Sequence, residues 1–401
     1  MLEGRRLWFV GIGGAGMSAL ALVAREWGAE VGGSDRTRSS YVDRLEAAGI
    51  SVAIGHDAAN VPEGAEVIVS SAIASDNPEV VGREVTRRGE LLAELVSLRP
   101  SIVVGGAHGK TTTASMIAFC LDRLGLDPSF LIGGEVPQLG GNAHAGSGWL
   151  VAEGDESDRS LELLRPRIAV VTNVELDHHA TFASEDEVRA LFDRWLAEAP
   201  LQVRGEVLEP VSFELRIPGE HNRRNAASAL AALELADVPR ADAERVLPEF
   251  EGVGRRLERR GEAGGVAVFD DYGHHPSEIA ATLAAARASV NGGRVLVVFQ
   301  PHLYSRTRHL AGELAAALAA ADAVAVTDVY AAREDPVTGV SGKLVVDALA
   351  AERPGMPVAW TPSLEDAVQF LARRARPGDL VLTIGAGDVE RAGPLILEEL
   401  A

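Results

Sequence analysis

Short apolar runs alternate with longer helix-like segments along the whole chain, and this alternation constrains the fold more than any other feature. Runs such as "RLWFV", "SIVVG" and "VLVVF" have the length of buried strands, and each is followed by an Ala-, Leu- and Arg-rich segment with helical periodicity. Strands that alternate with helices are typical of parallel sheets covered by helices. The sequence therefore predicts an α/β protein.

The pattern restarts twice within the 401 residues, which predicts three domains. We expect a Rossmann-like domain at residues 1–97, a central P-loop-type domain with a parallel sheet at 98–254, and a second Rossmann-like domain at 255–401. In the first domain the runs "RLWFV", "EVGGSD" and "EVIVSS" predict strands. The segments "MSALALVAREWG", "YVDRLEAAG" and "PEVVGREVTRRG" predict helices, the last over residues 78–89.

Composition excludes several classes of protein. A formal net charge of −20 argues against a nucleic-acid partner, because the phosphate backbone would be repelled. The single cysteine, Cys120, allows no intramolecular disulfide, and its apolar surroundings predict a buried helix position. The N-terminal apolar run imitates a signal peptide, but its glycines make a poor apolar helix, and no other run could span a bilayer. We expect a cytoplasmic protein without a membrane partner.

The stretch "RLWFVGIGGAGMSAL" joins a strand to a helix through a glycine-rich turn. Gly11, Gly13 and Gly16 have the spacing of a dinucleotide-binding loop. Such a turn at a helix N-terminus favours any pyrophosphate. Two interpretations stay open: an NAD site with Asp35 at the end of the second strand, or a site for another diphosphate.

A second glycine loop, "GGAHGKTTT", occupies residues 105–113. Gly106 and Gly109 let backbone N–H groups turn toward an anion, Lys110 can reach the β- and γ-phosphates, and Thr111 offers a hydroxyl to Mg²⁺. The strict P-loop spacing would place a glycine where this chain has Val104. The loop predicts an ATP site; a tight turn with a solvated lysine is the alternative.

Two acidic clusters follow strands of the same domain. The segment "VAEGDESD" supplies Glu153, Asp155, Glu156 and Asp158, and "TNVELDHH" supplies Glu175, Asp177, His178 and His179. The carboxyl ends of parallel strands meet at one edge of a sheet, so we expect these groups beside the phosphate loop. Carboxylate, imidazole and hydroxyl groups around phosphate suit Mg²⁺ or Mn²⁺ better than zinc.

The third domain carries two further polar stretches, "DDYGHHPSEI" and "FQPHLYSRTRHL". The first could form a metal or acid–base site, or could be a strand-to-helix turn with a proline at the helix start. In the second stretch, Arg306 and Arg308 could fork onto a carboxylate. Spacing alone leaves these alternatives open.

Taken together, the motifs resemble those of the Mur ligases over nearly the full length, and within that family the ligases that join L-alanine to UDP-N-acetylmuramate. The matching stretches, in the family's order, are "GIGGAGMSAL", "SSAIASDNPE", "GAHGKTTT", "AEGDESD", "TNVELDHH", "EHNRRNAASAL", "FEGVGRRLE", "DDYGHHPSE", "FQPHLYSRTR" and "DVYAARE". The resemblance implies a first domain that binds the UDP-sugar, a second that binds ATP, and a third that closes over both and takes the amino acid.

The resemblance also implies a reaction of peptidoglycan precursor synthesis. ATP would phosphorylate the lactyl carboxylate of UDP-N-acetylmuramate, and the amine of L-alanine would attack the acyl phosphate. The first glycine loop would then hold the UDP diphosphate rather than NAD. Alternatives are a muropeptide ligase acting on the same sugar and a catalytically weak nucleotide-binding relative. A nicotinamide dehydrogenase would leave "GAHGKTTT" unexplained.

Motif positions imply roles for individual residues. Catalysis is assigned to Lys110, His178, Arg256 and Asp271. Nucleotide binding is assigned to Gly106, His108, Gly109, Lys110, Thr111, Thr112, Asn222, Asn225 and Arg256. Metal binding is assigned to Thr111, Glu153 and His178. Substrate binding is assigned to Gly11, Gly13, Gly14, Ala15, Gly16, Asp35, Ser70, Ser71, Tyr272, His274 and Arg306.

The chain departs from the family pattern in three places. Ala107 stands where the family loop usually has threonine, and Leu303 stands where it carries an arginine. Only a short segment joins "FDRWLAEAP" to "FELRIPGEHN", where the family has a longer β-rich stretch. We therefore expect the central domain to lack peripheral hairpins.

Overall fold

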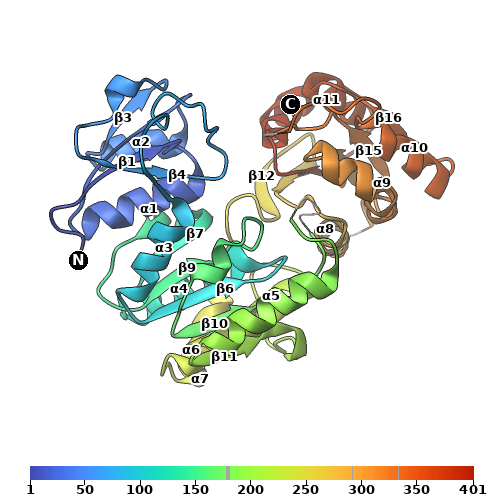
Figure 1. Cartoon of the computed structure of the whole chain (residues 1–401). Helices are drawn as coiled ribbons and strands as arrows, with labels where there is room; N and C mark the ends of the chain where they lie inside the picture. Colours follow the sequence, from blue (N-terminus) through green and yellow to red (C-terminus); the bar gives the residue numbers. More distant parts are fainter. Residues whose placement is uncertain (178–180, 291, 333) are drawn as a thin grey trace. The chain divides into compact units, whose positions relative to one another are not determined.

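A computed structural model describes residues 1–401 except 178–180, 291 and 333. Three sheets follow one another along the chain, each composed mainly of parallel strands with helices between them (Figure 1). The predicted three-domain α/β architecture is confirmed. The borders predicted after residues 97 and 254 stay predictions.

The first sheet has five parallel strands in the order β3-β2-β1-β4-β5. Its strands are β1 (Arg6–Val10), β2 (Glu30–Asp35), β3 (Ser51–Ile54), β4 (Glu66–Val69) and β5 (Val85–Arg87), and its helices are α1 (Ala15–Glu26), α2 (Ser40–Ala47) and α3 (Arg88–Ser97). The strand order reverses between β1 and β4. In open sheets, ligands bind at such a switch point, outside the carboxyl ends of the strands.

The predicted helix over residues 78–89 is wrong. Residues 78–84 form turns, β5 follows, and α3 begins only at Arg88. Gly82 has φ +74°, a left-handed conformation that does not continue a helix. Residues 85–87 instead pair with β4 and extend the sheet by one strand, because a Val-Thr pair suits a strand better than a helix.

The second sheet has the strand order β11-β10-β6-β9-β7-β8, with only β8 antiparallel to its neighbour. Its strands are β6 (Ser101–Gly105), β7 (Ser129–Val136), β8 (Gly141–His144), β9 (Leu150–Glu153), β10 (Ile168–Val171) and β11 (Leu201–Arg204), and the associated helices are α4 (Lys110–Arg123), α5 (Glu185–Glu198), α6 (Glu220–Leu235) and α7 (Arg240–Val246). The central strand β6 lies between β9 and β10. The loops that follow these three strands therefore meet at one edge.

The segment between β11 and α6 is short, as expected for a central domain that lacks peripheral hairpins. After β11, which ends the sheet beside β10, residues 205–207 form a single 3₁₀ turn and the chain then runs to α6 without further strands. Residues 201–219, all of which the structure describes, contain no hairpin.

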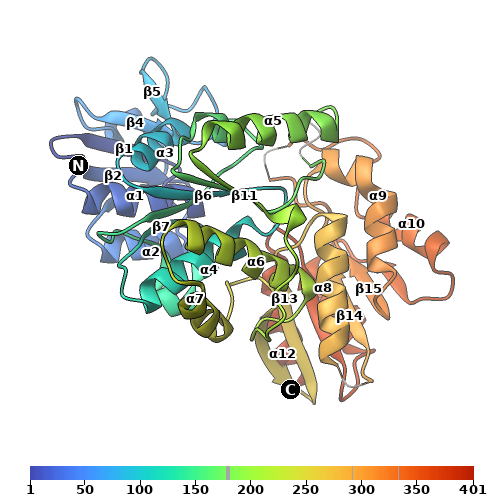
Figure 2. The ribbon, with the colours of Figure 1, turned by 90° about the horizontal axis from the view of Figure 1, so that it is seen from below.

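The third sheet has the order β12-β13-β17-β14-β15-β16, with only β12 antiparallel. Its strands are β12 (Glu258–Ala263), β13 (Val266–Asp271), β14 (Val295–Phe299), β15 (Ala323–Val326), β16 (Val358–Trp360) and β17 (Leu380–Ile384), and its helices are α8 (Pro276–Ser289), α9 (Tyr304–Leu318), α10 (Lys343–Glu352), α11 (Leu364–Ala372) and α12 (Ala392–Leu400). Val297 packs in a core with α8–α10, whereas its neighbour Val298 packs with α11 and α12. Figure 2 shows α8 beside β14. Successive strand residues thus fill two opposite cores.

Packing divides the chain into two compact units. The first contains residues 1–176, 181–216 and 222–251, and the second contains 177–180, 217–221 and 252–401. One buried cluster in the first unit includes Leu91 and Leu95 of α3 together with Phe192 and Trp195 of α5. The first two domains therefore share a hydrophobic core.

Two predictions drawn from composition, a buried Cys120 and the lack of a membrane-spanning run, can be compared with the structure. Cys120 is fully buried in α4, and burial raises the pKa of its thiol to about 12, so it is not a reactive thiolate. Among the described residues, no helix combines the length and apolarity needed to cross a membrane.

Close packing at Gly33 generates a stability prediction. A Cβ at this position in β2 would lie 2.4 Å from the carbonyl oxygen of Phe9. We expect Gly33→Ala to destabilise the first unit by about 1–3 kcal/mol, the usual cost of overpacking. Gly312→Ala in α9 is the control, because no atom lies within 4 Å of its added Cβ. Urea unfolding followed by circular dichroism measures both, and equal effects would contradict the packing argument.

Candidate functional site

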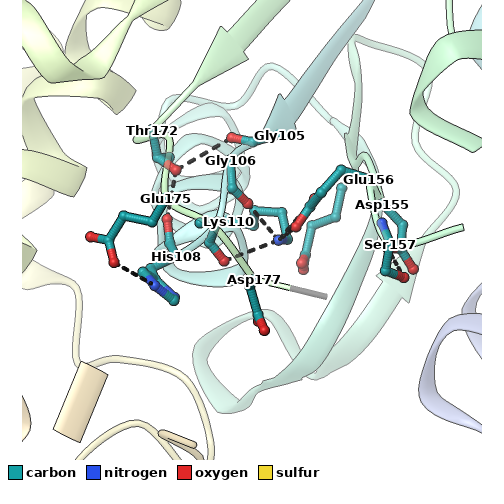
Figure 3. A network of polar contacts seen from close by, with 12 residues as sticks. Gly105, Gly106, His108, Lys110, Asp155, Glu156, Ser157, Thr172, Glu175 and Asp177 are labelled. Carbon is teal, nitrogen blue, oxygen red and sulfur yellow. Dashed lines mark hydrogen bonds and ion pairs between the residues drawn. The ribbon is translucent and has the colours of Figure 1, made fainter. Parts of the chain in front are cut away.

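Loops after three neighbouring strands of the second sheet form the candidate site. Residues 106–109 connect β6 to α4, and the loops after β9 and β10 lie on either side of them. Figure 3 shows the polar side chains of these loops around Lys110. The structure thus brings the acidic residues of "VAEGDESD" beside the phosphate loop, as the sequence predicted.

The loop conformation depends on two glycines. Gly106 has φ +127°, and a Cβ there would lie 2.2 Å from Thr172 Oγ1. Gly109 has φ +78°, and its Cβ would lie 2.3 Å from Asn225 Oδ1. Both the backbone angles and the walls of the loop therefore exclude larger residues.

Asn173 clamps the middle of the loop. Its Oδ1 accepts a hydrogen bond of 2.9 Å from the backbone N–H of His108, and its Nδ2 donates one of 2.9 Å to the carbonyl of His108. The imidazole Nε2 of His108 lies 3.4 Å from Glu175 Oε2. The loop is thus fixed by the strand-end segment that follows β10.

Lys110 forms an ion pair with a buried carboxylate. Its Nζ donates to Glu156 Oε1 at 3.0 Å and to the carbonyl of Ala107 at 3.2 Å, and also to the carbonyl of Gly106. Glu156 is 3% exposed, and burial raises its pKa to about 7 although Lys110 opposes this. Burial alone would lower the pKa of Lys110, but the charges of Glu156 and Asp155 outweigh it and raise that pKa. Lys110 therefore keeps its positive charge at neutral pH.

Two oxygen donors lie at the start of α4. Thr111 Oγ1 donates to Glu153 Oε2 at 2.9 Å, and Glu153 Oε1 accepts a bond of 2.6 Å from the backbone N–H of Gly133. A hydroxyl and a carboxylate are ligands that Mg²⁺ prefers. Thr111 and Glu153 therefore fit a Mg²⁺ site, whereas His178, the third predicted ligand, lies outside the described residues.

The remaining nucleotide-binding candidates of this unit lie on α4 and α6. Thr112 is buried on α4. Asn222 and Asn225 are buried on α6, where Asn225 Nδ2 donates to Asn222 Oδ1 at 3.4 Å. Asn225 packs closely against Gly109. The structure therefore places α6, which carries both asparagines, beside the phosphate loop.

The first glycine loop lies at the switch point between β1 and β4. Gly11 has φ +77°, and the backbone N–H of Gly13 donates to Asp35 Oδ2 at 2.9 Å. The carboxylate of Asp35 also accepts from the N–H of Thr37 at 3.2 Å. Asp35 therefore stabilises the loop itself.

The other predicted residues of this loop surround the start of α1. Gly14 is the N-cap of α1 and Ala15 its first residue, while Gly16 packs against the side chain of Arg88. Ser70 is partly buried and Ser71 is exposed, both directly after β4. Both strand-end loops at the switch point thus contain predicted substrate-binding residues.

In the second unit, Asp271 supports the turn that carries Arg256. Asp271 Oδ2 accepts from the N–H of Leu257 at 2.8 Å, and its Oδ1 accepts from the N–H of Gly273 at 2.8 Å. Burial raises the pKa of Asp271 to about 6. Arg256 Nη1 lies 3.5 Å from Glu278 Oε1.

A row of rings comes from the loops that follow β13, β14 and β15. Tyr272, His274, His302 and Tyr330 have successive ring centroids 5.7, 5.6 and 5.9 Å apart. Burial lowers the pKa of His274 to about 4, and its Nδ1 lies 3.1 Å from the carbonyl oxygen of Tyr272. A carbonyl only accepts, so Nδ1 carries the hydrogen and Nε2 carries the lone pair.

Arg306 does fork onto a carboxylate, that of Asp177. Its Nη2 donates to both carboxylate oxygens, at 2.8 and 3.0 Å, and both side chains are buried. Leu303, where the family carries an arginine, precedes α9 with φ +68°. Arg308 is exposed on the same helix.

Sequence reasoning missed three residues of these sites. Asn173 stands inside the "TNVELDHH" motif, from which the sequence predicts roles only for the acids and the histidines. Arg255 precedes Arg256 in "GVGRRLE" and binds the carbonyls of Gly385 and Gly387. Arg88 lies in the segment mistaken for a helix, so no signal pointed to it.

Comparison with known proteins identifies the family. Family models match in order along the chain: "Mur ligase family, catalytic domain" at residues 6–99, "Mur ligase middle domain" at 104–202, and "Mur ligase, glutamate ligase domain" at 255–387. The UDP-N-acetylmuramate--L-alanine ligase of Streptomyces coelicolor is 43% identical over 98% of this chain and 97% of its own length. The chain belongs to the Mur ligase family. This membership removes the dehydrogenase alternative.

Other relatives of this Mur ligase extend the comparison. The UDP-N-acetylmuramate--L-alanine ligase of Desulforamulus reducens is 38% identical over 99% of this chain and 98% of its own length. The crystal structure of the Thermotoga maritima UDP-N-acetylmuramate-alanine ligase MurC gives a TM-score of 0.83 at 27% identity over 98% of both chains. The murein peptide ligase of Psychrobacter arcticus shares the fold, with a TM-score of 0.71 at 23% identity over 99% of both chains.

Alignment length also bears on the short central domain. The alignment to the Streptomyces coelicolor relative runs over 451 positions, although the Mur ligase described here has 401 residues. The relative therefore contains stretches that this chain lacks, which agrees with the missing β-rich segment.

Burial of His274 predicts a loss of stability in acid. Below pH 6.5 the unfolded imidazole takes up a proton, whereas the folded one stays neutral until about pH 4. This difference costs about 2 kcal/mol of stability between pH 7 and pH 5. We expect His274→Gln to lose less stability than the parent protein over that interval in urea unfolding. Equal losses would show that His274 titrates normally in the folded state.

Proposed function

We propose that this Mur ligase joins L-alanine to the lactyl carboxylate of UDP-N-acetylmuramate and converts ATP to ADP and phosphate. The similarity to curated UDP-N-acetylmuramate--L-alanine ligases, 43% over 98% of the chain for one of them, is the observation that carries this proposal. The similarity spans all three domains, so the proposal covers the binding sites for the sugar nucleotide, ATP and the amino acid.

ATP binds at the second glycine loop in this proposal. The backbone N–H groups of residues 106–109 surround the phosphates, and the positive charge of Lys110 lies beside the phosphoryl group that is transferred. Thr111 and Glu153 would hold Mg²⁺ (or Mn²⁺), with His178 as a further ligand. When bound, such an ion neutralises phosphate charge.

The first step moves a phosphoryl group between two anions. A lactyl carboxylate oxygen forms a bond to the γ-phosphorus, while the bond from that phosphorus to the bridging oxygen breaks and ADP leaves with the electron pair. The first glycine loop, with Gly11, Gly13, Gly14, Ala15 and Gly16, holds the UDP diphosphate. Asp35, Ser70 and Ser71 complete that site.

The second step forms the amide. The amine of L-alanine attacks the acyl carbon, phosphate leaves, and the nitrogen loses a proton. Neutral His274 offers Nε2 as an acceptor for the ammonium group, beside Tyr272. Arg306 is assigned to the carboxylate of the amino acid, which would replace Asp177 as its partner. The resemblance assigns Arg256 to the nucleotide, and Asp271 fixes the turn that carries it, while Asn222 and Asn225 complete the ATP site.

Phosphate release measured with purified protein tests the proposal. We expect release to require ATP, UDP-N-acetylmuramate and L-alanine together. Release with an L-alanyl peptide but not with L-alanine would indicate a muropeptide ligase instead. No release with either would indicate a nucleotide-binding relative without ligase activity.

The charge of Lys110 generates a sharper prediction. We expect Lys110→Ala to lower kcat by on the order of 10²-fold or more, the scale for loss of one preorganised electrostatic contact. Lys343→Ala is the control, because Lys343 is exposed on α10 and pairs only with Asp347 among the contacts described. Near-normal turnover of Lys110→Ala would exclude this loop as the phosphoryl-transfer site.

The first glycine loop can be tested separately. A Cβ at Gly13 would lie 2.9 Å from both Asp35 Oδ2 and Val42 Cγ2, so Gly13→Val should distort the loop. Titration calorimetry should show loss of UDP-N-acetylmuramate binding and unchanged binding of a non-hydrolysable ATP analogue. Normal binding of the sugar nucleotide would place its diphosphate elsewhere.

A further inference from the structure

Arg88, the first residue of α3, connects the first glycine loop to the acidic loop after β9. Its Nη2 donates to Asp155 Oδ2 at 2.9 Å and lies 3.7 Å from Asp158 Oδ2. Its Nη1 lies 3.1 Å from the position that a Cβ would take at Gly16, in the first turn of α1. One guanidinium group therefore binds the loop that carries Glu156 and lies next to the helix turn that follows the loop proposed for the sugar nucleotide.

The backbone packs closely at the same place. A Cβ at Gly89 would lie 2.4 Å from Ser160 Cβ, so a glycine is needed for this approach of α3 to the acidic loop. Ser160 in turn binds that loop: its N–H donates to Asp158 Oδ1 at 3.0 Å and its Oγ donates to the carbonyl of Asp155 at 3.3 Å. The acidic loop is thus folded onto the start of α3.

Asp155 stands between the charges of Arg88 and Lys110. Its Oδ1 accepts hydrogen bonds from the backbone N–H and the Oγ of Ser157, at 2.9 and 2.6 Å, while its Oδ2 accepts from Arg88. The next residue, Glu156, accepts from Lys110 Nζ at 3.0 Å. A continuous series of charged contacts therefore runs from Arg88 to Lys110 at the end of the phosphate loop.

We propose that Arg88 is a positioning residue that couples the two ligand sites: a diphosphate at the first glycine loop fixes its guanidinium, which through Asp155 orders the acidic loop whose Glu156 pairs with Lys110. The second ligand then binds a site that is already ordered and loses less free energy in ordering it. The identity of the two ligands, UDP-N-acetylmuramate and ATP, rests on the proposed function. Coupling of this kind is reciprocal.

Equilibrium binding measures the coupling directly. The dissociation constant of a non-hydrolysable ATP analogue is measured with and without saturating UDP-N-acetylmuramate, and the reverse titration is carried out as a check. We expect the sugar nucleotide to tighten analogue binding by about 5-fold or more in the parent protein, within the usual range of allosteric coupling. In Arg88→Ala and in Asp155→Asn the ratio should fall close to one.

Matched variants separate coupling from a general structural effect. Arg87→Ala, which removes the exposed neighbouring arginine, should keep the coupling of the parent protein. Arg88→Lys should show intermediate coupling, because one ammonium group cannot reach Gly16 and Asp155 as the guanidinium does. The double variant Arg88→Ala/Asp155→Asn should lose no more than either single variant.

The outcomes distinguish this inference from the proposed function. A parent protein that does not bind UDP-N-acetylmuramate would overturn both. A parent protein that ligates L-alanine without any coupling, or an Arg88→Ala variant with undiminished coupling, would overturn only the role of Arg88. If Arg88→Ala does not fold, Arg88→Lys decides, and coupling equal to that of the parent protein would overturn the inference.

Discussion

The buried ion pair between Lys110 and Glu156 is the interaction on which the rest of the site depends. A lysine that follows a glycine loop needs a partner when the loop is folded into the protein, and Glu156 provides it at 3.0 Å. Burial penalises both charges, and the pair exists because β6 and β9 are neighbours whose carboxyl ends meet. The sheet order therefore determines where the positive charge of the site is held.

The two glycine loops differ in the charges that accompany them. Residues 11–16 contain no charged side chain, and the loop is fixed by Asp35 through the N–H of Gly13. Residues 105–113 contain Lys110 and lie between two acidic strand-end loops. The first arrangement suits a diphosphate that is only held, while the second suits a phosphoryl group whose charge changes during reaction.

Much of this arrangement could be predicted from sequence because its determinants are local. Gly106, Gly109 and Lys110 stand between a buried strand and a helix, and the acidic motifs directly follow strands, so the α/β pattern alone brings them together. The wrong helix over residues 78–89 shows the limit of local patterns. Its Val-Thr pair became a strand because β4 offered an unpaired edge, a contact that no local pattern contains.

Contacts between segments that are far apart in the sequence could not be predicted from local patterns either. The core shared by α3 and α5 and the pair of Arg88 with Asp155 both join residues far apart in the chain. Arg88 could have been noticed only as one basic residue among several in "REVTRRG". Asp177 presents the same difficulty, because its partner Arg306 lies 129 residues away.

The central claim is that Lys110 and its glycine loop hold the phosphates of ATP. A crystal structure of the protein with a non-hydrolysable ATP analogue tests it most directly. The claim predicts β- or γ-phosphate oxygens within hydrogen-bond distance of Lys110 Nζ and of the backbone N–H groups of residues 106–109. An analogue whose phosphates lie instead against residues 11–16, with Lys110 still paired only to Glu156 and the loop carbonyls, would contradict it.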